Sequence, residues 1–318
     1  MKQVDQNFLS VNENGIYCKV GDFYLDPRKP VHKAIISHAH GDHAIAGNSI
    51  IYATAQTIEF MKYRHSVKHK TEYRPISIHD SFKIGEVLIQ FYEANHIPGS
   101  VQILMEYDGV KYLYTGDFKL QNDATCIPFE VVICDVLITE TTFANPEVSH
   151  PDPVESIKQL TTITNNILLG AYALGKAQRL TKLLNDHCPE KNILIHHSIS
   201  PLHKIYERQG IDLGKWQFYD RKLMKNPVGN YIYIVPPLTF NSYAYIRNAV
   251  RIFASGWENL QKNNDAKLFI SDHADWNDLL FLIEKSRAKE VWTIHGNGNY
   301  LKKYFQNKEP KVRLFISS

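Results

Sequence analysis

The chain has 318 residues, with 36 lysines and arginines against 33 aspartates and glutamates, which gives a formal net charge of +3 with histidine neutral. Hydrophobic residues make up 44% and charged residues 22%. This globular mixture excludes a disordered tail, a coiled coil and a collagen-like fibre. Apolar runs such as residues 232–235 are far shorter than the roughly 20 residues of a membrane span, and the first ten residues lack a signal-peptide pattern. We expect a cytoplasmic protein without membrane segments, long enough for about two domains.

The first half of the chain is predicted to form short strands joined by turns. Asp108-Gly109 lies between two apolar runs and is the strongest hairpin signal, and Gly21-Asp22 marks a second hairpin. One helix is expected at residues 56–63. The expected strands are residues 15–20, 23–27, 31–37, 76–78, 82–84, 87–91, 101–107, 110–114 and 136–139.

From residue 150 onward, strand and helix patterns alternate. This alternation predicts an α/β unit with a mostly parallel sheet. The expected strands are residues 167–170, 193–195, 231–235, 267–270 and 291–294. The expected helices are residues 154–165, 171–185, 201–208 and 276–285.

Four metal-competent side chains lie within six residues after a buried strand: His38, His40, Asp42 and His43. Histidine nitrogen and carboxylate oxygen suit zinc, manganese or iron. Gly41 gives the loop freedom to bend. The alternation predicts that His38 and His40 face one metal ion, and that Asp42 and His43 face another.

Three further residues at strand ends complete a two-metal site. Asp117 is the expected bridge because a carboxylate has two oxygens, whereas His96 would complete the first site and His295 the second. A ligand set without thiolates favours an open position for water over a closed structural site. Two neighbouring metal ions activate water and support an in-line displacement at phosphorus, so the pattern indicates hydrolysis.

These motifs resemble a known family. The run from His38 to His43, with Asp26, His96 and Asp117 in order, is similar to the signature of the metallo-β-lactamase superfamily. Three later segments resemble the downstream motifs of its β-CASP nuclease branch, which includes the pre-mRNA 3′-end cleavage endonuclease, RNase J and the cross-link-repair nucleases: residues 138–143, 271–275 and 293–296. Across residues 15–301 the sequence is most similar to bacterial ligase-associated DNA exonucleases, also described as predicted mRNA 3′-end processing factors.

The resemblance implies an α/β (α+β) fold. Residues 1–144 and 255–318 would form a four-layer αβ/βα metallo-β-lactamase core, and residues 145–254 an inserted β-CASP-like domain. It also implies two divalent ions, zinc or manganese, in two ligand sets that share one carboxylate. The first set would be His38, His40, His96 and Asp117, and the second Asp42, His43, Asp117 and His295.

Glu140 and His273 would form the acid pair of such an enzyme, with His273 near the leaving oxygen and Glu140 orienting it. Asp42 would join them in catalysis. Asp26 would steady a metal-binding histidine; the alternative is that it only caps the turn at Pro27.

Weaker signals indicate a phosphate site. Lys176 and Arg179 fall at the start of an expected helix, and Ser198 follows an expected strand. The alternatives are a solvated helix face for the two basic residues and ordinary helix capping for the serine.

The expected function is metal-dependent phosphodiester hydrolysis of nucleic acid, as an exonuclease in DNA repair. Single-stranded DNA is the favoured substrate, and family resemblance suggests association with a DNA ligase and helicase system. RNA processing is the alternative, since a histidine at position 295 is usual in RNA-directed members of the branch and a valine in cross-link-repair members. A small-molecule metallohydrolase is less expected, because it needs neither Glu140 with His273 nor the inserted unit.

Overall fold

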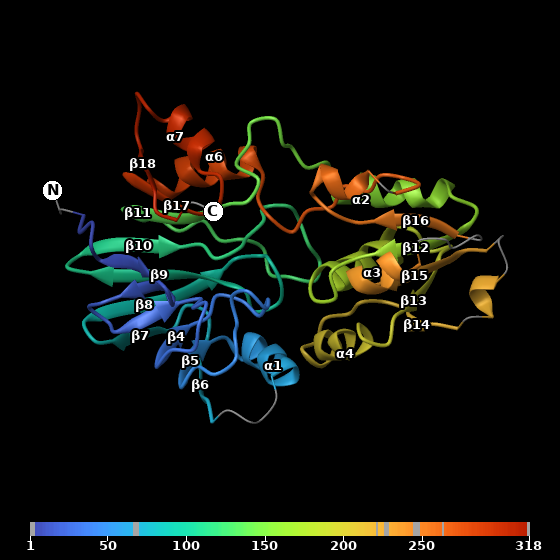
Figure 1. Ribbon diagram of the computed structural model, residues 1–318, viewed down its shortest axis with the longest axis horizontal. Coiled ribbons are helices and arrows are strands. Elements are labelled where there is room, and N and C mark those ends of the chain that lie inside the picture. Colours follow the sequence, from blue (N-terminus) through green and yellow to red (C-terminus); the bar gives the residue numbers. More distant parts are fainter. Residues whose placement is uncertain are drawn as a thin grey trace. The chain divides into compact units, whose positions relative to one another are not determined.

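The computed structural model describes residues 4–65, 70–220, 222–225, 229–243, 249–262 and 264–316 (Figure 1). Its chain divides into two compact units. Unit 1 comprises Met1–Leu120, Cys126–Ser149 and His273–Ser318, and unit 2 comprises Gln121–Thr125 and His150–Asp272. Among the described residues, no helix has the length and apolar character to cross a bilayer.

Unit 1 contains two sheets. The first has the strand order β1-β2-β3-β4-β5-β6 and the second β18-β17-β11-β10-β9-β8-β7. The strands of the first sheet are β1 (Leu9–Asn12), β2 (Gly15–Cys18), β3 (Phe23–Leu25), β4 (Lys33–Ile35), β5 (Ile50–Ala53) and β6 (Glu72–Pro75). Those of the second are β7 (Ser81–Ile84), β8 (Val87–Glu93), β9 (Val101–Tyr107), β10 (Val110–Tyr114), β11 (Val136–Thr141), β17 (Glu290–Gly296) and β18 (Lys311–Leu314).

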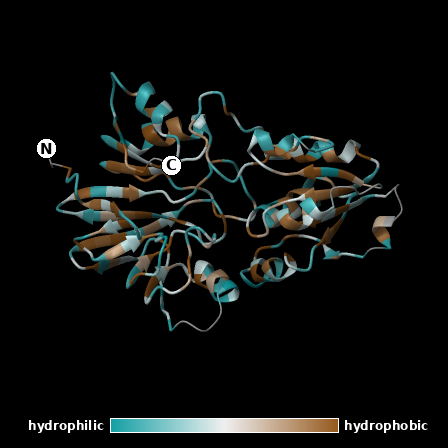
Figure 2. Ribbon diagram, viewed as in Figure 1, coloured by the Kyte–Doolittle hydropathy of each residue, from teal (hydrophilic) through white to brown (hydrophobic). Residues whose placement is uncertain are grey.

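The two sheets of unit 1 share one apolar core. Phe23 and Ile35 of the first sheet belong to the same buried cluster as Ile103 and Trp292 of the second. Strand β8 shows the cause in its sequence, because its residues alternate between buried and half-buried. Figure 2 shows hydrophobic brown and hydrophilic teal segments interspersed along these strands.

Helices cover the outer faces of both sheets. Helix α1 (Ala55–Arg64) packs on the first sheet through a cluster that includes Ile58 and Met61. Helices α6 (Trp276–Ser286) and α7 (Asn299–Tyr304) pack on the second, through Leu282 and Leu301 among others. These four layers confirm the predicted α/β fold class.

Unit 2 has one five-stranded sheet in which all neighbouring strands are parallel, in the order β14-β13-β15-β12-β16. Buried clusters occupy both faces of the sheet, so its three central strands are mostly apolar without alternation. The strands are β12 (Asn166–Gly170), β13 (Asn192–Ile195), β14 (Gln217–Phe218), β15 (Tyr231–Val235) and β16 (Ala249–Phe253). The helices are α2 (Pro153–Lys158), α3 (Lys176–His187), α4 (Ser200–Arg208) and α5 (Pro237–Ser242), with 3-10 turns at Gln159–Thr162, Leu223–Lys225 and Glu258–Gln261.

Several local predictions are confirmed and three are wrong. The Asp108-Gly109 turn joins β9 to β10, and both residues have the positive φ that a tight hairpin needs. Residues 76–78 form no strand, since pairing with β5 is made by the preceding segment β6. Residues 267–270 contribute only one isolated bridge, at Leu268.

The third error concerns the start of α3. The helix begins at Lys176 and not at residue 171, because Gly175 has a φ of 88° and ends a non-helical turn.

The predicted boundary of the core at residue 255 also differs from the observed grouping. Residues 255–272 belong to unit 2, where Leu268 and Ile270 enter its apolar core.

Lys176 and Arg179, expected at a phosphate site, are buried inside unit 2, with 3% and 1% of their surface exposed. The Lys176 ammonium donates to the Ile270 carbonyl at 2.6 Å and lies 3.0 Å from the Asp272 carboxylate. The Arg179 guanidinium donates to the other oxygen of Asp272 at 3.0 Å, and its Nε lies 3.5 Å from Asp123 Oδ2. Both cations neutralise buried carboxylates, so the alternative of a solvated helix face is wrong, and neither side chain is exposed as a phosphate ligand.

Arg179→Leu should strongly destabilise unit 2, because it removes a buried cation that lies beside the carboxylates of Asp123 and Asp272. Removing one partner of a buried ion pair costs about 3–5 kcal/mol. Lys182→Gln on the same helix breaks an exposed pair with Asp186 and should cost at most about 1 kcal/mol. Urea unfolding followed by hydrogen exchange of unit 2 peptides measures both. Equal effects of the two variants would contradict the assigned role of Arg179.

Candidate active site

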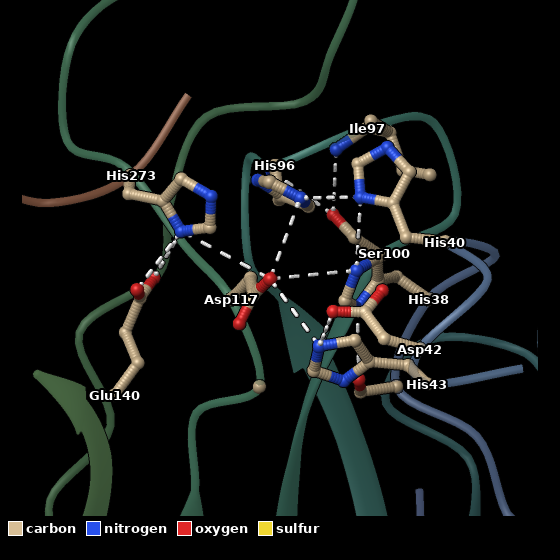
Figure 3. Close-up of polar contacts among 12 residues, drawn as sticks. His38, His40, Asp42, His43, His96, Ile97, Ser100, Asp117, Glu140 and His273 are labelled. Carbon is tan, nitrogen blue, oxygen red and sulfur yellow. Dashed lines mark hydrogen bonds and ion pairs between the residues drawn. The ribbon is translucent and has the colours of Figure 1, made fainter. Parts of the chain in front are cut away.

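One end of the two sheets of unit 1 collects the side chains singled out in the sequence (Figure 3). All of them except His273 follow or end a strand, where loops present reactive groups. His38, His40, Asp42 and His43 follow β4, His96 follows β8, Asp117 follows β10, Glu140 ends β11, His295 lies near the end of β17 and His273 precedes α6.

Three imidazoles converge on one point. His40 Nδ1 lies 3.1 Å from His38 Nε2 and 3.0 Å from His96 Nε2. The Asp117 Oδ2 atom lies 3.6 Å from His38 Nε2 and 3.9 Å from His96 Nε2. Donor atoms about 2.0–2.1 Å from a tetrahedral zinc ion are roughly 3.3 Å apart, so this donor set fits such a cation.

Hydrogen bonds determine which nitrogen of His38 is available. The Ser37 hydroxyl donates its only proton to the Asp26 carboxylate, so it can only accept from His38 Nδ1, 3.0 Å away. Because Nδ1 carries the proton, Nε2 of the neutral ring has a lone pair. That lone pair faces the other two imidazoles, as a metal ligand requires.

The same carboxylate orients His43. Asp26 Oδ2 accepts from His43 Nδ1 at 2.9 Å and from the Tyr114 hydroxyl at 2.9 Å. His43 Nε2 is left 3.4 Å from Asp117 Oδ2 and 3.7 Å from Asp42 Oδ2. These hydrogen bonds show that Asp26 does more than cap the turn at Pro27.

The second predicted ligand set is more open than the first. The Asp42 side chain is 79% exposed, and the His295 ring is centred 5.2 Å from that of His43. Among the described residues, three groups have ligand atoms within 4.8 Å of one another, and none includes Asp42 or His295. The groups are His38, His40, His96 and Asp117; Asp26, His38 and His43; and Asp117, Glu140 and His273.

Burial and neighbouring charge set the protonation of these groups. Burial and nearby histidines hold the pKa values of His38 and His96 well below their usual range. Burial opposes the charged form of His43, but Asp117 and Asp26 outweigh it and raise the pKa of His43. Burial likewise opposes ionisation of Asp117, but His43 and His273 hold its pKa well below its usual range. The neutral imidazoles of His38 and His96 beside the ionised Asp117 are the forms that bind a metal, whereas His43 must first lose a proton.

Glu140 and His273 form a pair beside this cluster. Glu140 is 1% exposed, and its Oε1 atom accepts from the Phe118 backbone at 2.9 Å. His273 Nδ1 lies 2.9 Å and 3.1 Å from the two carboxylate oxygens and 3.9 Å from Asp117 Oδ2. Since a carboxylate only accepts, Nδ1 of His273 carries the proton. Asp117 is thus shared between the histidine cluster and the acid pair.

Supporting residues were missed in the sequence. Lys119 is fully buried, and its ammonium donates to the carbonyls of Asn95 at 2.5 Å and His96 at 2.7 Å, which fixes the loop of a predicted ligand. Ser37 and Tyr114 hold Asp26. A lysine two residues after Asp117 carries no sequence signal for such a role, whereas the positions of Ser37 and Tyr114 at strand ends could have indicated theirs.

Ser198 lies in unit 2 and is not among the groups above. It is exposed, and its hydroxyl lies 2.8 Å from His196 Nδ1. With Lys176 and Arg179 buried, it is the solvent-accessible member of the predicted phosphate set.

The comparisons with known proteins agree with this geometry. The family described as "Beta-lactamase superfamily domain" matches residues 23–170. The match covers just under half of the chain and agrees with the predicted resemblance to the metallo-β-lactamase superfamily. The names of the relatives agree with the predicted resemblance to the β-CASP nuclease branch.

Two relatives illustrate the match. The "Probable DNA ligase" of Opitutus terrae is 27% identical over 89% of this chain and 28% of the relative. The "RNase J-like protein" of Methanocaldococcus jannaschii is 29% identical over 50% of this chain and 44% of the relative. The chain therefore spans less than half the length of these relatives.

A solved structure supports the fold alone. The crystal structure of a protein of unknown function from Enterococcus faecalis V583 matches 90% of this chain and 80% of that one. The TM-score is 0.59 and the sequence identity 14%.

Asp26→Asn should weaken metal binding while the fold persists. The amide is a poorer acceptor for His43 and Ser37, and asparagine tolerates the positive φ of 40° at this position. Loss of such a supporting contact typically costs 10–100-fold in metal affinity. Competition with a chromophoric zinc chelator measures it. Asp22→Asn, in the same hairpin but paired with Lys33 at the surface, should leave affinity unchanged; an unaffected Asp26→Asn would refute the role.

Proposed function

We propose that this chain is a metal-dependent phosphodiester hydrolase that degrades nucleic acid from an end, with single-stranded DNA as its favoured substrate. The observation that carries the proposal is the Glu140–His273 pair, which shares Asp117 with the histidine cluster. A purely structural metal site needs no such pair. The names of the relatives, which include a DNA ligase and an RNase, support nucleic acid as the substrate class.

The ions in this proposal are two divalent cations, zinc or manganese. His38, His40, His96 and Asp117 would hold one of them. Asp42, His43, Asp117 and His295 would hold the other. When bound, such ions polarise a phosphoryl oxygen and make water a stronger nucleophile near neutral pH.

The chain's own groups supply orientation and a proton. Asp26 keeps His43 Nε2 turned toward Asp117 through its bond to Nδ1. Displacement at phosphorus breaks the bond to a nucleoside oxygen, which must gain a proton as it leaves. Glu140 binds His273 through Nδ1–H, which favours the imidazolium form. His273 Nε2–H is then the proton donor to that oxygen.

DNA is favoured over RNA because the match to the ligase-named relative covers 89% of this chain, whereas the RNase-named one covers 50%. The same relative supports association with a DNA ligase. A helicase partner follows from the family resemblance alone, and the proposed location is the cytoplasm. Ser198 would bind a terminal phosphate through its exposed hydroxyl.

RNA is the second candidate substrate. The histidine at position 295, whose ring lies beside His43, is the residue type of RNA-directed members of the branch. If the assay below shows a preference for RNA, this residue predicts the substrate better than the match to the ligase-named relative does. The proposed role then becomes RNA processing.

The test is a nuclease assay on matched single-stranded DNA and RNA, each labelled at the 5′ or 3′ end, with manganese or zinc. We expect mononucleotide release from one labelled DNA end, and its loss in Asp42→Ala. Full nuclease activity in the Asp42→Ala variant would refute the two-ion site. No cleavage of either nucleic acid, with metal bound, would refute the proposed function.

His273→Asn should lower the rate on DNA by about 10²–10⁴-fold, because the leaving oxygen loses its proton donor. With the p-nitrophenyl ester of thymidine monophosphate, whose leaving group needs no proton, the defect should largely disappear. His79→Asn, a surface histidine bound to Glu130, is the matched control and should retain full activity. An equal defect on both substrates would show that His273 is not the acid.

A further inference from the structure

Helix α7 and strand β18 contact each other in unit 1 (Figure 1). A depression of about 590 Å³ beside them is lined by Lys302, Lys308 and Lys311, together with Phe305 and Glu309. A volume in this range accommodates a nucleotide-sized ligand. None of these residues belongs to the candidate active site.

Positive charge is concentrated in this part of the chain. Residues 299–313 contain five basic side chains, at positions 302, 303, 308, 311 and 313, and one acidic side chain, Glu309, which gives 5 − 1 = +4. The whole chain carries only +3. The remaining residues therefore nearly cancel in total, and this segment is one of two with such a local excess, because residues 62–74 also contain five basic side chains and one acidic side chain.

The three lysines of the depression are not neutralised. Among the described residues, none of their ammonium groups lies within the 4.0 Å of a carboxylate oxygen that defines an ion pair. Lysines elsewhere do pair, as Lys29 does with Glu13 at 2.8 Å and Lys158 with Glu155 at 3.0 Å. Three unpaired cations around one depression repel each other, and an anion between them removes that repulsion.

Aromatic rings hold one of these cations in place. The Lys308 ammonium lies 3.4 Å from the centroid of the Tyr304 ring and 5.2 Å from that of Phe305. Such cation–π contacts restrict a side chain that is otherwise flexible, so less entropy is lost when it binds an anion. Phe305 also gives the depression an apolar wall among the charges.

We propose that this depression is a second binding site for single-stranded nucleic acid, outside the active site. Lys302, Lys308 and Lys311 bind phosphodiester groups, and Phe305 contacts a sugar or base. Cations interleaved with aromatic rings are the usual means of binding single strands without reading their sequence. The inference rests on the proposed function, since it takes the same substrate class. The site would bind the nucleic acid away from the phosphodiester bond that is cut.

The experiment measures binding without hydrolysis. Wild-type protein and the variant K302Q/K308Q/K311Q are titrated with fluorescent oligothymidine in EDTA at several salt concentrations. The control variant K29Q/K158Q/K182Q removes the same charge from lysines that pair with carboxylates at the surface. Hydrolysis of the p-nitrophenyl ester of thymidine monophosphate with metal present, and thermal melting, report the active site and the fold.

We expect the Kd of the depression variant to rise about tenfold or more, and the slope of log Kd against log salt to fall by about 2, since each phosphate contact on a single strand contributes roughly 0.7. The control variant should bind like wild type, and ester hydrolysis should be unchanged in both. Equal weakening in both variants would show a general charge effect and overturn the proposal.

Two other outcomes are decisive. If an acidic peptide such as oligoglutamate binds wild type as tightly as oligothymidine does, and only through these lysines, the depression takes a protein segment and the proposal is wrong. If oligothymidine binds through the depression but no nucleic acid is cleaved with metal present, the binding site stands and the proposed hydrolysis fails.

Discussion

The buried carboxylate of Asp26 is the interaction on which the site depends. It accepts from the Ser37 backbone, the Ser37 hydroxyl, His43 Nδ1 and the Tyr114 hydroxyl, all within one end of unit 1. These bonds fix the orientation of two histidine rings, so that Nε2 of His38 and Nε2 of His43 both face Asp117. Neighbouring imidazoles disfavour one another's protonated forms, and the adjacent carboxylates offset this repulsion.

Asp117 extends this constraint to the chemistry. Its Oδ2 atom lies within 3.9 Å of nitrogen atoms of His38, His43, His96 and His273. One carboxylate therefore connects the histidine cluster with the Glu140–His273 pair. The sandwich fold makes the arrangement available, since β4, β8, β10, β11 and β17 all end in this region and each brings one or more of these groups.

Much of the fold and the site could be predicted because the signals are local. The hairpin at Asp108-Gly109, the strand preceding His38 and the strand ends at His96 and Asp117 follow from turn chemistry and apolar runs. The strand at residues 76–78 was wrong, because pairing with β5 decides the strand and apolar composition does not. Lys176 and Arg179 were predicted at a phosphate site because they fall at the start of an expected helix. Their carboxylate partners, Asp123 and Asp272, are distant in sequence and gave no local signal. The role of the buried Lys119 was missed for the same reason, because the carbonyls that it binds, those of Asn95 and His96, are distant in sequence.

The central claim is that the converging histidines form a metal centre. Anomalous X-ray scattering from crystals grown with zinc tests it most directly, with data collected on both sides of the zinc absorption edge. The account predicts an anomalous peak among His38, His40, His96 and Asp117, and a second peak beside His43. Crystals with zinc bound elsewhere, or with these side chains hydrogen-bonded to one another and no peak between them, would contradict it.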